Sequence, residues 1–289
     1  MLHWLVEPGL WSNSAVHLGA AVGVVVAAVS AWVGLFTVLR AQSFAGHALA
    51  DVAMAGGAGA GLLAWPALVG FVTGSLAGAG AMELIGVERL RQRDVATGVV
   101  LGAATGLSAL FLYLVSLDSS SSGATQVILF GSLFSVSAHV LWLVLVACAL
   151  LAVAVAAIGR PLLFSSVSPE AAGARGVRVA RVSLSFTAVM AVTVGLSAIV
   201  LGAVLSTALL IGPPAAALRL GRGLRATGLA AAAFGTGAVL AGVVASYDSY
   251  YWWPSHRALP VSFCVVTVIV LELAAVSAVR ALARRRGDG

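Results

Sequence analysis

Long apolar stretches, separated by short polar segments, constrain the fold of this chain more than any other feature. Several reach the roughly 18 residues that an α-helix needs to cross the hydrocarbon core of a bilayer. Charged residues make up only 9% of the chain, against about 25% in soluble globular domains. Lipid offers backbone groups no hydrogen bonds, so spanning segments must satisfy them internally as helices. The sequence therefore predicts an all-α, polytopic membrane helical bundle that forms one transmembrane domain over residues 1–289.

We expect eight or nine transmembrane helices, and nine agrees best with the arrangement of the loops. The two spans predicted within 182–218 are short for two complete traverses, so a broken or re-entrant helix is an alternative there. The predicted spans lie at about 18–39, 43–64, 66–86, 95–117, 137–159, 182–199, 201–218, 226–246 and 260–281.

The placement of arginine predicts the orientation of the chain. All 16 basic residues are arginine, and in the predicted topology only Arg257 lies on the side opposite to the others. Because cytoplasmic loops carry the excess of basic residues, we expect the N-terminus outside and the C-terminus in the cytoplasm. The net charge of +6 therefore orients the chain among membrane lipids and does not indicate a nucleic-acid partner.

The chain contains no lysine. A Walker A loop needs a lysine to reach the nucleotide phosphates, so this chain cannot hydrolyse ATP through such a loop. Any ATP hydrolysis that drives it belongs to a separate subunit. We therefore expect a transport or binding subunit with no catalytic residues, and not an enzyme.

Glycines recur every four residues in two neighbouring predicted spans. Such spacing gives one smooth helix face on which another backbone can pack closely, so we expect tight helix packing at both series. The first series is Gly70, Gly74 and Gly78, and the second is Gly98, Gly102 and Gly106.

Two ionisable side chains share one face of the second predicted span. His47 and Asp51 are four residues apart, as are Ser43 and His47, so all three lie on one side of a helix. Ionisable groups inside a membrane are costly and need a reason. An imidazole and a carboxylate can together bind one divalent cation. The alternative is a hydrogen-bonded pair that fastens two helices.

The segment 160–181 is predicted to be a cytoplasmic loop that contains a short helix. Ser168 is a favourable N-cap, Pro169 suits the first helical position, and Glu170 complements the helix dipole. The helix should end near Gly176. A capped helix at the membrane surface is suited to docking a soluble partner, and an ordered loop is the alternative.

The second span resembles a motif of the permease subunits of ABC importers for manganese, zinc and iron. Residues 40–51 read Arg-Ala-Gln-Ser-Phe-Ala-Gly-His-Ala-Leu-Ala-Asp, where the family pattern has Gly-Asp-Ala-Leu-Ser-His after an arginine. The aspartate and histidine have exchanged places, and the exchange keeps both on one helix face. Further segments that resemble the family, in the family's order, are 94–99, 129–137, 169–176 and 209–216.

The resemblance implies a bacterial plasma (inner) membrane complex of two permeases and two ABC ATPase subunits, fed by an extracytoplasmic metal-binding protein. The second permease would be an identical copy or a paralogue. His47 and Asp51 would form a transient site for the transported zinc, manganese or iron ion, with no permanently bound cofactor. The coupling helix that docks the ATPase would comprise Ser168, Pro169, Glu170, Ala171, Ala172 and Gly176.

Two other functions fit parts of the same pattern. A related permease for a siderophore or another organic cargo would bind its cargo without His47 and Asp51. An ion-coupled secondary transporter would use the membrane carboxylates Asp51 and Glu272 as carriers. Copurification of an ATPase distinguishes the ABC permeases from the secondary transporter.

Overall fold

The computed structural model describes residues 14–85, 90–117, 128–131, 133, 138–221, 223–252 and 258–287. These residues are overwhelmingly helical, and none of them forms a β-strand. The helices are α1 (Ser14–Leu39), α2 (Ser43–Leu62), α3 (Ala67–Ile85), α4 (Leu90–Leu117), α6 (Ala138–Val167), α7 (Pro169–Ala174), α8 (Val179–Leu201), α9 (Ala203–Leu218), α10 (Leu224–Trp252) and α11 (Val261–Gly287).

Each of the nine predicted spans coincides with a helix, which confirms the all-α membrane bundle. Seven of the described helices are long and apolar enough to cross a membrane. The two predicted spans outside this group are α2 and α9. In α2, five of the 20 residues are glycine and two are ionisable, while α9 has only 16 residues. The orientation of the termini stays a prediction.

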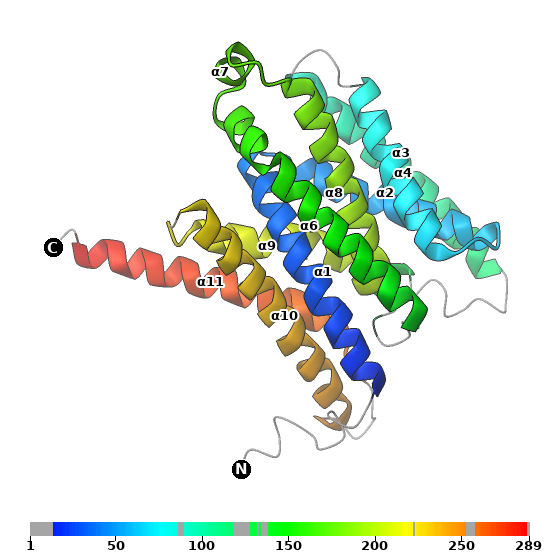
Figure 1. The fold of residues 1–289 in the computed structure, drawn as a ribbon. Coiled ribbons are helices and arrows are strands. Elements are labelled where there is room, and N and C mark those ends of the chain that lie inside the picture. Colours follow the sequence, from blue (N-terminus) through cyan, green and yellow to red (C-terminus); the bar gives the residue numbers. More distant parts are fainter. Residues whose placement is uncertain are drawn as a thin grey trace.

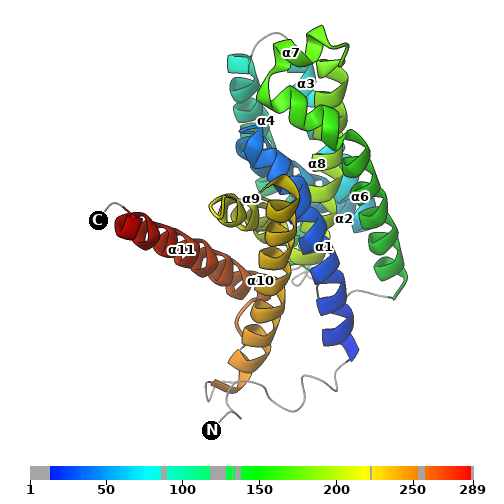
Figure 2. The same ribbon diagram turned by 60° about the vertical axis from the view of Figure 1, so that its left-hand side comes forward.

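Helices α1 and α8 lie at the centre of the bundle, and α6 packs against both of them from the outside (Figures 1 and 2). On one side of them, α2 packs against both α3 and α4, and on the other side α9, α10 and α11 pack together. Helix α7 lies at one end of the molecule, and α11 leaves the bundle at a steep angle to its neighbours (Figures 1 and 2). The arrangement therefore places two helix groups around a shared central layer.

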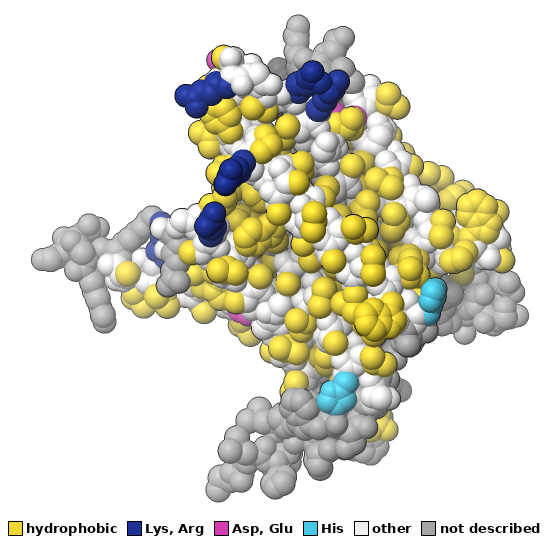
Figure 3. Space-filling model, viewed as in Figure 1, with side chains coloured by type: hydrophobic (Ala, Val, Ile, Leu, Met, Phe, Trp, Pro, Cys, Tyr) yellow, Lys and Arg dark blue, Asp and Glu magenta, His cyan; other side chains and the backbone are white. Residues whose placement is uncertain are grey.

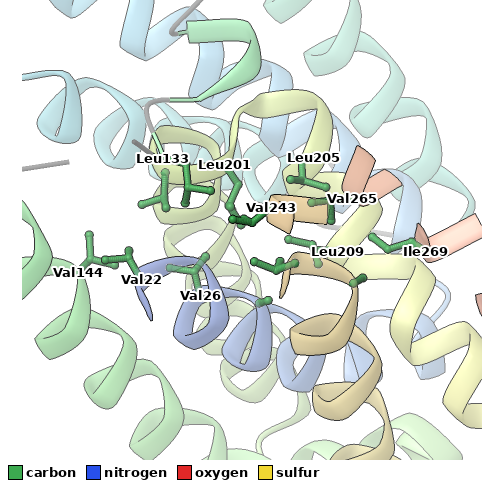
Figure 4. Packing of buried hydrophobic residues seen from close by; sticks show 14 of the residues in the cluster. Val22, Val26, Leu133, Val144, Leu201, Leu205, Leu209, Val243, Val265 and Ile269 are labelled. Atoms are coloured by element: carbon green, nitrogen blue, oxygen red, sulfur yellow. The ribbon is translucent and has the colours of Figure 1, made fainter. Parts of the chain in front are cut away.

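A cluster of buried apolar side chains holds α9 inside the bundle (Figure 4). Leu205 and Leu209 of α9 are fully buried. They pack with Val26 of α1, Val243 of α10 and Val265 of α11. This packing fixes the short helix α9 at the centre, where it also contacts α2.

Gly202 interrupts the helical segment between α8 and α9, and its φ is +95°. A side chain there would lie 2.6 Å from the carbonyl oxygen of Leu129, so the backbone of another segment occupies the space. Residues 182–218 therefore form one long span, α8, followed by a short internal helix. The alternative prediction of a broken helix within 182–218 therefore describes this segment better than the prediction of two complete membrane spans.

The glycine series behave differently from each other. Gly70 and Gly74 of α3 pack directly on the backbone of α2 at Gly56, as the first series predicts. In α4, a methyl group on any glycine of the second series would contact nothing among the described residues. The prediction of tight packing within this chain is therefore wrong for the second series.

Helix α6 extends beyond its predicted end at residue 159 and reaches Val167. The segment 160–181 is thus mostly helical: it comprises the end of α6, then α7, then the start of α8. The α6 extension is held by Leu162, which is fully buried, and by Ser165, which is also buried. Burial of these two side chains is a tertiary effect that local sequence signals do not record.

Candidate functional site

Packing on the other faces of α2 determines where His47 and Asp51 point. Ala48, Leu49 and Ala50 are buried against neighbouring helices. His47 is exposed on the surface of the single chain and Asp51 is half-buried. The pair predicted from spacing therefore lies on an accessible helix face and is not sealed inside a helix contact.

Helix α4 supplies the hydrogen-bond partners of Asp51. The single hydroxyl proton of Thr105 is shared between Oδ2 of Asp51, at 3.1 Å, and the backbone carbonyl of Leu101 in its own helix, at 2.9 Å. The hydroxyl of Ser108 donates to the backbone carbonyl of Asp51 at 3.1 Å. The Thr105 bond orients the carboxylate and still leaves lone pairs for a cation, because a carboxylate accepts at about four positions.

Helix α9 supplies the partner of His47. Nδ1 of the imidazole lies 3.4 Å from the hydroxyl oxygen of Thr207. A hydrogen bond at one ring nitrogen fixes the ring orientation and directs the other nitrogen toward a ligand. The short helix after the Gly202 break thus reaches the face that carries His47.

His47 and Asp51 alone would form only part of a metal site at this face. Among the described residues, no group of three or more His, Cys, Asp or Glu side chains could hold a metal ion. His47 and Asp51 therefore have only hydroxyl groups as neighbouring ligand candidates, whereas tight divalent sites use four or more ligands. Met54, one helical turn from Asp51, packs instead in an apolar cluster with Phe71.

Glu272, the other carboxylate of interest, lies in a different part of the bundle. Its Oε2 is buried and has no hydrogen-bond partner among the described residues. The Glu272 side chain lies near Gly237 of α10, whereas Asp51 is held by α4. The two carboxylates share no partner in the described contacts.

Helix α7 has the caps that the sequence predicts. Ser168 adopts extended backbone angles and its hydroxyl accepts a hydrogen bond from the backbone N–H of Ala171 at 3.3 Å. Pro169 occupies the first turn with Glu170. Beyond the C-terminus, Gly176 has a φ of +82°, which suits glycine at a helix stop. The prediction of a short capped helix is confirmed.

The outer face of α7 is exposed. Ala172 is fully buried and anchors the helix, while Pro169, Glu170 and Ala171 are exposed. Basic side chains on the face in Figure 3 gather at the α7 end of the molecule and along one edge, and the rest of this face is largely hydrophobic. The α7 surface is thus the polar, accessible end of an otherwise apolar face.

A cavity of about 230 Å³ lies between the base of α2 and the ends of α3, α4 and α8. It is lined by Arg40, Gln42, Glu83, Asp94 and Thr187, among others. Glu83 accepts a hydrogen bond from the hydroxyl of Thr187 at 3.2 Å. Asp94 lies inside α4, four residues after its start.

Sequence reasoning missed the hydroxyl partners Thr105 and Thr207. Threonine is common in membrane helices, and each partner is more than 50 residues from the side chain that it contacts. For Thr105, the only local signal is its place in the glycine series of α4, next to Gly102 and Gly106. The glycine spacing indicates a smooth face of α4, but it does not predict that Thr105 contacts Asp51.

Residues 14–277 match the model of the ABC 3 transport family. The manganese transport system membrane protein MntC of Listeria innocua is 29% identical over 225 residues, which cover 78% of this chain and 79% of that protein. The manganese import system permease protein ScaB of Streptococcus gordonii is 25% identical, with 78% and 80% covered.

Solved structures share the fold. A chain of PsaBC from Streptococcus pneumoniae, in complex with Fab, superimposes with a TM-score of 0.79 at 20% identity, covering 93% of this chain and 92% of that one. An inward-facing putative metal-chelate type ABC transporter gives a TM-score of 0.73 at 13% identity, with 93% and 87% covered.

The family match covers most of the chain and includes both α2 and α7. Together with the seven apolar helices, the bacterial relatives make this a multi-pass protein of the bacterial inner membrane. The chain belongs to the ABC 3 transport family.

Proposed function

We propose that this chain is the membrane-spanning permease of an ABC importer that moves a divalent metal ion, manganese first among candidates, from an extracytoplasmic binding protein to the cytoplasm. The observation that carries the proposal is the accessible His47–Asp51 face of α2, with a threonine hydroxyl beside each side chain. The MntC and ScaB relatives are both named for manganese transport or import. Zinc and iron use the same ligand types.

Partial ligation suits transport. A permeating ion must bind well enough to enter and weakly enough to leave. One imidazole, one carboxylate and nearby hydroxyls form a shell that water or a second permease copy completes. A second copy facing the first across this surface would supply another His47 and Asp51, and ions would pass between the two chains.

Helix α7 is the proposed contact with the ATPase. Its exposed Glu170 and Ala171 lie at the end of a helix hairpin formed by α6 and α8. A rigid, capped helix transmits displacement better than an irregular loop, because its hydrogen bonds hold its length. We propose that α7 binds the separate ATPase subunit and moves with it.

The test of the metal path replaces both ligands. In the source bacterium, the His47→Ala and Asp51→Ala double variant should reduce accumulation of radiolabelled manganese to the level of a strain that lacks the protein. Matched controls are His139→Ala, an imidazole at the start of α6, and Glu272→Gln, a carboxylate on α11. Both controls should retain uptake at equal protein abundance.

Contrary results separate the alternatives. Normal uptake by the double variant would eliminate the metal path through α2. Loss of uptake in Glu272→Gln, together with failure of any ATPase to copurify with the wild-type chain, would favour an ion-coupled secondary transporter.

A further inference from the structure

One guanidinium group connects both helices that flank α7. Nη1 of Arg40 donates to the hydroxyl oxygens of Ser165 and Ser166, each at 3.3 Å. Nη2 donates to the hydroxyl oxygen of Ser183 at 3.2 Å. The first two serines end α6 and the third begins α8. Because α7 lies between these helices, Arg40 holds the two ends of the α7 connection together.

The serine hydroxyls are oriented to accept. Ser165 and Ser166 each donate their own proton to the carbonyl oxygen of Leu162. Their lone pairs are then directed to Arg40. The guanidinium also lies 5.8 Å from the ring centre of Phe186, a fully buried residue of α8, within the range of a cation–π contact. The planar fork of arginine suits such simultaneous contacts.

Arg40 is also close in the chain to the metal-site helix. It follows the last residue of α1, and α2 begins three residues later at Ser43. The connection is a tight turn in which Ala41 has a φ of +54° and the N–H of Gln42 donates to the carbonyl of Thr37 at 2.9 Å. A displacement of Arg40 therefore reaches the first turn of α2, which carries His47.

Incomplete packing leaves room for this displacement. The cavity of about 230 Å³ is lined by Arg40, Gln42 and Phe44 on the α1–α2 side. Met82 and Thr187 line it from α3 and α8. The base of α2 thus borders a partly open pocket, whereas most helix contacts in a folded protein are closely packed.

We propose that Arg40 is a positioning residue that transmits movement of α7 to α2 and so couples ATP hydrolysis to the access of metal to His47. This inference rests on the proposed function, in which α7 binds the ATPase and α2 carries the ion. Arg40 contacts neither nucleotide nor metal in this scheme. Its effect appears in how much metal moves for each ATP hydrolysed.

The decisive experiment measures that ratio. The complete complex, with its ATPase and binding protein, is reconstituted in proteoliposomes, and manganese uptake and phosphate release are followed together. We expect Arg40→Ala to retain ATP hydrolysis and lower the number of ions moved per ATP about tenfold, within the 5- to 150-fold range of coupling between sites. Arg40→Lys keeps the positive charge but lacks the planar guanidinium that contacts several serines at once. It should therefore restore part of the number of ions moved per ATP.

Two further variants separate coupling from general damage. Triple replacement of Ser165, Ser166 and Ser183 by alanine removes the acceptors and should lower the ratio as Arg40→Ala does. The matched control is Arg219→Ala. Arg219 also bridges helices, from the end of α9 to Leu273 and Ser277 of α11. Its side-chain hydrogen bonds among the described residues go to α11 and not to α6 or α8, so its loss should leave the ratio unchanged.

The outcomes distinguish this inference from the proposed function. If the wild-type complex hydrolyses ATP without moving manganese, the proposed function fails. If the wild type transports and the Arg40 and triple-serine variants keep the wild-type ratio, only the role of Arg40 is overturned. If Arg40→Ala does not assemble with the ATPase, the triple-serine variant decides: an unchanged ratio there contradicts the inference.

Discussion

At the scale of single residues, two threonines contact the side chains that we propose bind the ion. Thr105 donates to Asp51, and Thr207 lies beside Nδ1 of His47. Neither threonine carries charge, so neither adds the cost that an ionised group incurs in a membrane. Their contribution is orientation: each fixes one side chain so that its remaining lone pairs face the same open surface.

Replacement of Thr105 by valine tests this orientation with nearly no change in shape. A hydrogen bond to a carboxylate contributes ~1 kcal/mol or somewhat more, so manganese uptake at subsaturating concentration should fall about fivefold at unchanged protein abundance. Thr73→Val is the matched control, because the Thr73 hydroxyl donates only within its own helix, to the carbonyls of Val69 and Gly70. Equal uptake in the two variants would show that Asp51 needs no such partner.

At the scale of helices, local sequence signals predicted the positions of the spans and the ends of the short helix α7. Apolar length located the spans, and the cap residues Ser168 and Gly176 bounded α7. The contacts of Arg40 with Ser165 and Ser183 were not predictable, because those partners lie 125 and 143 residues away. The extension of α6 was missed for the same reason: burial of Leu162 and Ser165 against other helices overrides the local boundary signals.

The break between α8 and α9 gives a prediction at this scale. Gly202 combines a φ of +95° with a ψ of 152°, a region that essentially only glycine occupies. Gly202→Ala should therefore add ~1–3 kcal/mol of backbone strain, besides the clash with the carbonyl of Leu129. We expect a lower melting temperature in detergent and a lower yield.

Gly221→Ala is the control for Gly202→Ala. Gly221 also has a positive φ, of +66°, but no described atom lies within 4 Å of the position that a side chain would take. Only the conformational cost applies there, and the melting temperature should fall less. If both variants melt alike, the contact between Gly202 and residues 129–131 does not hold α9 in place.

At the scale of the whole molecule, the proposed direction of transport requires that α7 face the cytoplasm. The end of α10 that carries Tyr250, Tyr251 and Trp252 lies at the opposite end of the bundle from α7 (Figure 1). Aromatic residues of this kind anchor helices at a membrane interface. The distribution of arginine predicts which of the two ends is cytoplasmic, and single cysteines can measure it.

Native Cys148 and Cys264 are both buried and can be replaced by alanine to give a background without thiols. Ala171→Cys then places a thiol on the exposed face of α7, and Ala258→Cys places one in the exposed segment before α11. In intact cells or spheroplasts, a membrane-impermeant maleimide should label position 258 and reach position 171 only after the membrane is permeabilised. The reverse pattern would place α7 outside, where no ATP is hydrolysed, and the importer model would fail with it, because a cytoplasmic ATPase could not bind the helix proposed to receive its motion.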